Sequence, residues 1–128
     1  MSNPISNYLG VHGAALPLRE QRMQLIASNL SNADTPNYKA KDLNFQAALE
    51  SAAAKASPLL TSSEQHLTLL DATPRIFERA GVQPSLDGNT VDADTERAAY
   101  GRAALEYRAS LSFIESKVRT MLTAITGQ

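Results

Sequence analysis

The sequence predicts an all-α protein whose long N- and C-terminal helices pack as a coiled-coil-like pair, with an irregular polar segment between them. Apolar side chains recur at alternating steps of three and four residues near both ends of the 128-residue chain, and the middle lacks this periodicity. Such spacing places side chains on one narrow stripe of a helix, which favours helix pairing over a broad globular core face. The predicted boundaries are 1–36 for the N-terminal helical segment, 37–90 for the middle segment and 91–128 for the C-terminal helix.

The two terminal stripes identify the side chains that we expect to be buried against helical partners. Only His12 and Arg19 interrupt the N-terminal stripe, and only Arg97 interrupts the C-terminal one. The apolar members near the N-terminus are Ile5, Leu9, Leu16, Met23, Ile26 and Leu30. Those near the C-terminus are Ala93, Tyr100, Ala104, Tyr107, Leu111, Ile114, Val118, Met121 and Ile125. Stripes of this length predict helices that need partners.

Local signals set the expected course of the first helix. Pro4 suits a first helical position, because the N–H that proline lacks has no partner there. Pro17 cannot continue the hydrogen-bond ladder, so a kink or break is expected near Leu16. Asn32 is a candidate for the left-handed residue that ends the helix.

The last helix and the middle segment carry fewer signals. Asp92 or Asp94 is the expected N-cap of the last helix, and Gly127 is expected to end it. In the middle, a short amphipathic stretch covers 43–49, and a few apolar residues near Ile76 are compatible with short strands.

Composition narrows the classes of function. The formal net charge is −1 and basic residues are not clustered, which argues against nucleic acid or an anionic membrane as partner. The chain has no cysteine, which excludes disulfides and thiolate chemistry. The N-terminus lacks a basic leader and a long apolar run, so we expect no cleaved signal peptide, and no stretch approaches the ~20 apolar residues of a membrane span.

The densest group of oxygen ligands, Asp87–Glu96, must be weighed as a calcium loop. Its spacing does not fit, because Val91 and Asp92 stand where such a loop needs a ligand and a glycine. A turn that leads into a capped helix is the preferred interpretation. The two histidines lie far apart in the sequence, without paired ligands. We therefore expect no catalytic residue, no metal and no cofactor.

Two polar segments stand out from this background. In the first, Thr35 before Pro36 redirects the chain after the helix, and Tyr38 is available to pack. Asn29 and Asn32 lie one helical turn apart, so both amides can bond backbone or neighbouring chains. The motif residues of the two segments are Asn29, Asn32, Thr35, Pro36, Tyr38, Asp87, Gly88, Asn89 and Asp92.

These segments resemble a known family. Residues 29–38, which read Asn-Leu-Ser-Asn-Ala-Asp-Thr-Pro-Asn-Tyr, look like the signature near the N-terminus of flagellar rod and hook axial proteins. Residues 39–45 and 84–92 are most similar to the basal-body rod proteins of the proximal rod. Asn37 stands where many axial proteins carry glycine. The resemblance implies that the terminal helices form the inner layer of a helical tube and that the middle segment makes outer contacts.

The same resemblance implies a role, a location and partners. The chain would be a structural, non-enzymatic subunit of the proximal rod, which spans the periplasm and transmits torque from the motor to the hook and filament. Its partners would be further copies of itself, other rod proteins, the MS-ring junction protein FliE and the flagellar type III export apparatus, with no direct membrane insertion. Two alternatives stay open: a soluble coiled-coil adaptor or export chaperone, and a peptidoglycan-active enzyme on the rod, which would need an acidic or histidine-based site.

Overall fold

The computed structural model describes residues 4–56, 76–81 and 85–127. Its elements in chain order are α1 (Pro4–Ser31), β1 (Lys41–Leu43), α2 (Phe45–Ala56), β2 (Ile76–Glu78) and α3 (Ala93–Thr126). The predicted all-α class is confirmed, because the two long terminal helices pack together and the strands form only a small two-stranded sheet.

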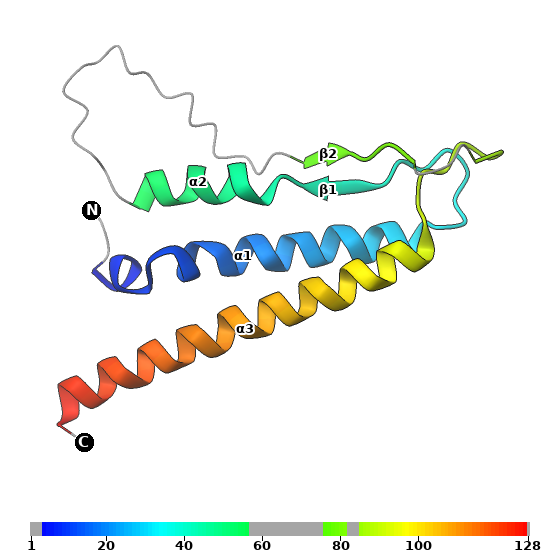
Figure 1. The fold of residues 1–128 in the computed structure, drawn as a ribbon. Coiled ribbons are helices and arrows are strands. Elements are labelled where there is room, and N and C mark those ends of the chain that lie inside the picture. Colours follow the sequence, from blue (N-terminus) through cyan, green and yellow to red (C-terminus); the bar gives the residue numbers. More distant parts are fainter. Residues whose placement is uncertain (1–3, 57–75, 82–84, 128) are drawn as a thin grey trace, which may run out of the picture.

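Helix α1 lies in the middle of the molecule (Figure 1). Helix α3 runs along one side of α1, and α2 with the β1–β2 pair lies along the other side. Contacts of Tyr8 with Lys117 and of Asn29 with Glu96 show that α1 and α3 are antiparallel. The end of α1 and the start of α3 therefore meet at one end of the molecule.

Helix α1 begins at Pro4, as the sequence predicts, but the predicted kink near Leu16 is wrong. Pro17 lies inside the helix, and the non-helical residue is Gly10, with φ 56° and ψ −140°. Residues with a side chain avoid this conformation, whereas glycine adopts it without a steric penalty. The change of direction therefore falls at the glycine, seven residues before the proline.

The predicted left-handed cap at Asn32 is also wrong. Residues that follow α1 form a tight turn, in which the N–H of Ala33 donates to the carbonyl of Leu30 at 3.2 Å. The left-handed residue is Asn37, with φ 61°, and it is the only non-glycine with positive φ in the described part of the chain. Asparagine is among the residues with a side chain that tolerate this region best.

Helix α3 has both predicted caps. The Asp92 carboxylate accepts the N–H groups of Asp94 and Thr95 at 3.1 Å each. Gly127 is left-handed, with φ 70°, and its N–H donates to the carbonyl of Thr123. With 34 residues the helix is about 50 Å long, which is long for so small a protein.

The described part of the middle segment is more regular than predicted. Strands β1 and β2 are antiparallel, with Lys41 opposite Glu78 and Leu43 opposite Ile76. The amphipathic stretch at 43–49 supplies the end of β1 and the start of α2. These elements cover one side of α1 and so extend the small core.

Small side chains dominate that core. The buried apolar residues of the described chain are Ala15, Ile26, Ala40, Leu43, Ala48 and Ala103. Four of these six are alanines, so little apolar area is removed from water for each buried residue. Ile26 and Leu43 are the only large apolar side chains in this set of buried residues.

Candidate functional site

The two motif segments lie side by side at the end of the molecule where α1 finishes and α3 begins (Figure 1). The N–H of Asn37 donates to the carbonyl of Asp87 at 2.8 Å, and the N–H of Thr90 donates to the carbonyl of Tyr38 at 3.0 Å. Segments about fifty residues apart in sequence are thus joined by backbone hydrogen bonds. The name junction is used below for residues 29–42, Arg79 and residues 85–96.

Asn29 is the centre of the junction, and its side chain is fully buried. The amide nitrogen donates to the carbonyl of Lys41 at 2.8 Å and to the Glu96 carboxylate at 3.1 Å. The amide oxygen accepts the N–H of Lys41 at 2.9 Å and the Tyr38 hydroxyl at 3.3 Å. An asparagine amide has two N–H donors and two acceptor positions, so all four are in use. Asn29 thereby connects α1, β1 and α3 within one chain.

Asn89 caps the end of α1 from a distance. Its amide nitrogen lies 2.8–2.9 Å from the carbonyl oxygens of Asn32, Ala33 and Thr35. Its amide oxygen accepts the N–H of Val91 at 2.7 Å. Carbonyls at a helix end have no partner inside the helix, and a buried side-chain donor satisfies them as well as water does. The sequence singled out Asn89 as a motif residue, but no local signal reveals a partner 57 residues away.

The side chains of Asn32 and Thr35 form hydrogen bonds within the turn that ends α1. The Asn32 amide donates to the carbonyl of Ser28 at 2.8 Å and accepts the Thr35 hydroxyl at 3.2 Å. These bonds are exposed, unlike those of Asn29. The two amides that look alike in the sequence therefore have different surroundings.

Gly88 packs against Asn37 so closely that no side chain fits. A Cβ atom built on Gly88 would lie 2.5 Å from the amide oxygen of Asn37. Gly88 also has a φ of 75°, which disfavours any other residue. The Lys39 ammonium donates to the Gly88 carbonyl at 2.7 Å and closes the same contact.

Buried charges join the middle segment to the helical pair. The Glu96 side chain is 3% exposed and pairs with Arg79, which follows β2. Asp42 of β1 is also buried and accepts two bonds from Arg22 of α1, at 3.1 and 3.3 Å. The Arg79 guanidinium lies 3.9 Å from Asp42, so the two pairs form one cluster. Sequence reasoning missed the pairing of Glu96 with Arg79, because that pairing depends on the β1–β2 register.

Farther along α1 and α3 the contacts are fewer. Arg19 pairs with Glu106 at 2.7 Å and lies over the Phe45 ring of α2. His12, the other residue that interrupts the N-terminal stripe, has its ring 4.0 Å from that of Phe113. Both interrupting residues therefore make specific contacts with α3.

Beyond His12, one residue of α3 holds the first turns of α1. The Lys117 ammonium donates to the Tyr8 carbonyl at 3.2 Å and lies 5.4 Å from the Tyr8 ring centroid. In return the Tyr8 hydroxyl donates to the Lys117 carbonyl at 3.3 Å. These exposed bonds are called the Tyr8–Lys117 clasp below. Among the described residues, they are the polar contact between α1 and α3 that lies farthest from the junction.

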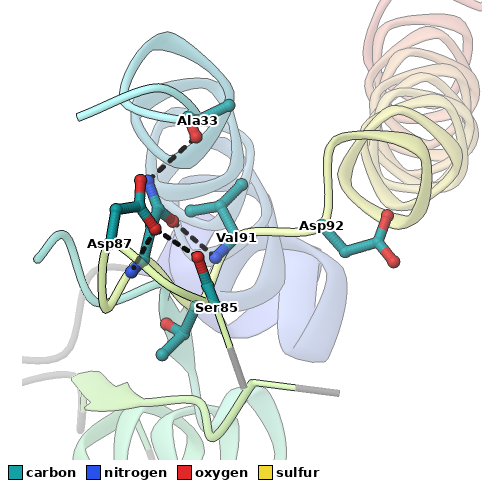
Figure 2. Close-up of a pocket in the computed structure, with 7 residues that line it drawn as sticks. Ala33, Ser85, Asp87, Val91 and Asp92 are labelled. Carbon is teal, nitrogen blue, oxygen red and sulfur yellow. Dashed lines mark hydrogen bonds between the residues drawn. The ribbon is translucent and has the colours of Figure 1, made fainter. Parts of the chain in front are cut away.

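The acidic turn before α3 borders a shallow hollow of about 360 Å³ (Figure 2). The Asp87 carboxylate accepts the Ser85 hydroxyl and the N–H of Asn89, and these bonds hold the pKa of Asp87 below its ordinary value. Bonds from the N–H groups of Thr95 and Asp94 lower the pKa of Asp92 in the same way. Nowhere in the described ranges do three or more acidic, histidine or cysteine side chains group as a metal site would require. The carboxylates are turn and cap residues instead.

The side chains of the two predicted stripes differ in how far they are buried. Ile26 is buried, Tyr100 and Ile125 are exposed, and the side chain of Ile5 lies outside the described residues. The half-buried members are Leu9, Leu16, Met23, Leu30, Tyr107, Leu111, Ile114, Val118 and Met121.

The face of α3 that is buried against the rest of the chain lies one position earlier than the predicted stripe. Its fully buried residues, seven apart, are Glu96, Ala103 and Ser110. The stripe itself passes through Arg97, Ala104 and Leu111. Much of the stripe therefore lies on the flank of the α1–α3 contact, where the chain covers it only in part.

Comparisons with known proteins identify relatives through the amino-acid sequence. A family model described as "Flagella basal body rod protein" matches residues 9–39, which include most of α1 and the first motif segment. In α1 and the first motif segment, the chain is therefore similar to flagellar basal body rod proteins. No helix in the described ranges is long and apolar enough to cross a membrane.

Relatives extend the match to nearly the whole chain. The flagellar basal body rod protein FlgB of Aeromonas hydrophila is 43% identical over 122 residues, covering 93% of this chain and 92% of that protein. FlgB of Cereibacter sphaeroides is 39% identical with 94% of each chain covered, and FlgB of Escherichia coli is 38% identical with 87% of each covered. The chain belongs to the FlgB family of flagellar basal body rod proteins.

Proposed function

We propose that the chain is a structural subunit of the proximal rod, through which torque passes from the motor to the hook and filament. In this proposal, residues 1–36 and 91–128 form the inner layer of the rod, and residues 37–90 make outer contacts. The buried polar side chains of the junction are hydrogen-bonded within the chain, and the proposal includes no catalysed reaction.

One observation carries the proposal: the protomer leaves several large apolar side chains of α3 exposed. On α3, Leu105 is 72% exposed, Leu122 is 54% exposed and Ile125 is 75% exposed, while the core consists mainly of alanine. Exposed apolar surface of this kind is typical of a protein that is completed by its neighbours. Helical partners would cover these side chains together with the half-buried members of the two stripes.

The proposed partners follow from the family. They are further copies of the chain, other rod proteins and the MS-ring junction protein FliE. The flagellar type III export apparatus would deliver the chain without a cleaved signal peptide, to the periplasm-spanning rod of the basal body.

The test uses an apolar residue that the protomer itself does not need. Ile125→Asp should leave the folded protomer as stable as the wild type, because the side chain is mostly exposed. In the assembled rod it would place a carboxylate in an apolar contact, which costs several kcal/mol at each subunit. We expect cells that carry this variant to lose intact basal bodies and motility. Thr123→Asp introduces the same charge on the opposite side of α3 and is the matched control.

Mass spectrometry of purified basal bodies provides the second measurement. The wild-type chain should be present in the rod fraction. A soluble adaptor or chaperone would instead be found in the cytosol as a small oligomer and would be missing from basal bodies. That result, or normal swimming with Ile125→Asp, would refute the structural role.

A further inference from the structure

A groove of about 250 Å³ lies beside the first turns of α3. The residues that line it are Arg22, Thr95, Ala98, Ala99, Arg102 and Ala103. The lining therefore includes three alanines and two guanidinium groups. Arg22 is bound to Asp42, whereas Arg102 is exposed and has no ion pair among the described residues. The groove therefore suits an apolar side chain with a negative charge next to it.

The turn before α3 presents such a pair. Leu86 is fully exposed, at 111% of its reference area. The turn around it is rigid, since the N–H of Gly88 donates to the Ser85 carbonyl at 3.2 Å and the Asp87 carboxylate accepts from Ser85 and Asn89. Those bonds also keep the pKa of Asp87 low, so the group stays charged at neutral pH. Leu86 is therefore an apolar side chain that is not buried by the described part of the chain.

We propose that Leu86 of one copy inserts into the α3 groove of a neighbouring copy, with Asp87 facing Arg102 across the contact. The inference rests on the proposed function, because it requires copies packed side by side in a rod. The leucine and the groove are different surfaces of one chain, so the contact is heterologous and repeats from copy to copy, as a helical polymer requires. Leu86 does not occupy the groove of its own chain, since its side chain is fully exposed.

Disulfide crosslinking tests the contact directly, because the natural chain has no cysteine. Two differently tagged copies are expressed together, one carrying Leu86→Cys and the other Ala98→Cys. Basal bodies are purified and treated with a mild oxidant. We expect a covalent dimer that contains both tags and disappears on reduction. Leu86→Cys combined with Ser112→Cys, an exposed position of α3 outside the groove, should give no such dimer.

Substitutions measure the contribution of the contact. Leu86→Ser should lower the association constant of each contact by about ten- to a hundredfold, which we expect as a loss of intact rods, whereas Leu86→Met should assemble normally. Arg102→Glu should also reduce assembly, and Arg108→Glu, an exposed arginine of α3 outside the groove, should have a smaller effect. Thermal unfolding of the Leu86→Ser protomer should match that of the wild type, because the side chain is fully exposed.

The outcomes separate this inference from the proposed function. Basal bodies that contain the chain but give no dimer, or that crosslink Leu86→Cys to a different rod protein, would overturn the groove contact and leave the structural role intact. Basal bodies that lack the chain would refute both.

Discussion

The two ends of the helical pair are held in different ways. At the junction, four polar side chains are buried: Asn29, Asp42, Asn89 and Glu96. Glu96 accepts from Asn29 and shares Arg79 with Asp42, while Asn89 separately binds carbonyls at the end of α1. At the far end, α1 and α3 are held by the Tyr8–Lys117 clasp and the His12–Phe113 contact, and Ile125 of α3 is exposed. Buried polar groups must be satisfied in one geometry, whereas exposed apolar groups accept any complementary surface.

The two ends of the helical pair therefore have different structural roles. The junction fixes how α1, α3 and the β1–β2 pair meet, and it needs no other chain to do so. The far end depends little on its own contacts, so its order is expected to come from neighbouring subunits. Amide exchange in the isolated protein should therefore be slow at the N–H of Lys41 and fast in the first turns of α1.

The largest effect is expected from breaking the buried charge cluster. Glu96→Ala leaves Arg79 and the Asn29 amide without their partner and should lower the free energy of unfolding by about 3–5 kcal/mol. Glu106→Ala removes the more exposed pair with Arg19, in which the glutamate side chain is 40% exposed, and should cost less than about 1 kcal/mol. Urea unfolding of both variants measures the difference. Equal losses would show that the junction is no more rigid than the rest of the helical pair.

The next effect separates the two motif amides. Asn29→Ala should cost roughly 1–3 kcal/mol for each buried group that loses its partner, foremost the Lys41 backbone. Asn32→Ala breaks only exposed bonds and should cost clearly less. Thermal unfolding of the two single variants provides the comparison. If Asn32→Ala were the more damaging change, the burial of Asn29 would not explain the motif.

Two glycines test the kink of α1 against the regular course of α3. Gly10→Ala forces a side chain into φ 56° and should destabilise the protein by about 1–3 kcal/mol. Gly101 lies inside α3, where an added Cβ meets nothing within 4 Å, so Gly101→Ala should stabilise the protein by about 1 kcal/mol. Chemical unfolding of both variants checks the signs. Stabilisation by Gly10→Ala would mean that α1 is straight at this residue.

The smallest effect concerns the cap of α3. Asp92→Asn should be nearly neutral at pH 7, and Asp92→Ala should be the more harmful change, because asparagine caps about as well as aspartate. The folded protein lowers the pKa of Asp92 below 3.8, so the carboxylate contributes stability above that pH and loses it as the pH falls through the folded pKa. The stability of the wild type relative to Asp92→Asn should therefore fall once the pH drops below 3.8, as followed by melting temperature. A calcium-dependent rise in melting temperature that Asp92→Asn abolishes would contradict the cap.

Sequence reasoning succeeds where the signal is local. Pro4, Asp92 and Gly127 mark helix ends through their own backbone chemistry, and all three are where the sequence places them. Sequence reasoning fails at Gly10 and Pro17. Both residues disfavour a helix, and the sequence does not show which of them interrupts α1 in the folded protein.

Long-range contacts explain the other differences. The buried face of α3 consists of Glu96, Ala103 and Ser110, which a search for large apolar residues passes over. Small side chains let the helices approach closely, and the glutamate is buried only because Arg79 and Asn29 reach it. Similarly, the left-handed residue is Asn37 because its backbone is bonded to Asp87, fifty residues further along the chain.

The span of the junction bonds also bears on the order in which the chain folds. The bond between Asn29 and Glu96 closes a loop of 67 residues, and that between Asn89 and Asn32 closes one of 57. Loop closure of this length is entropically costly and slow, so these contacts form late in folding. A chain that emerges N-terminus first cannot form these two bonds until Asn89 and Glu96 are available. The packing of α1 against the start of α3 therefore has to wait until about three quarters of the 128 residues have appeared.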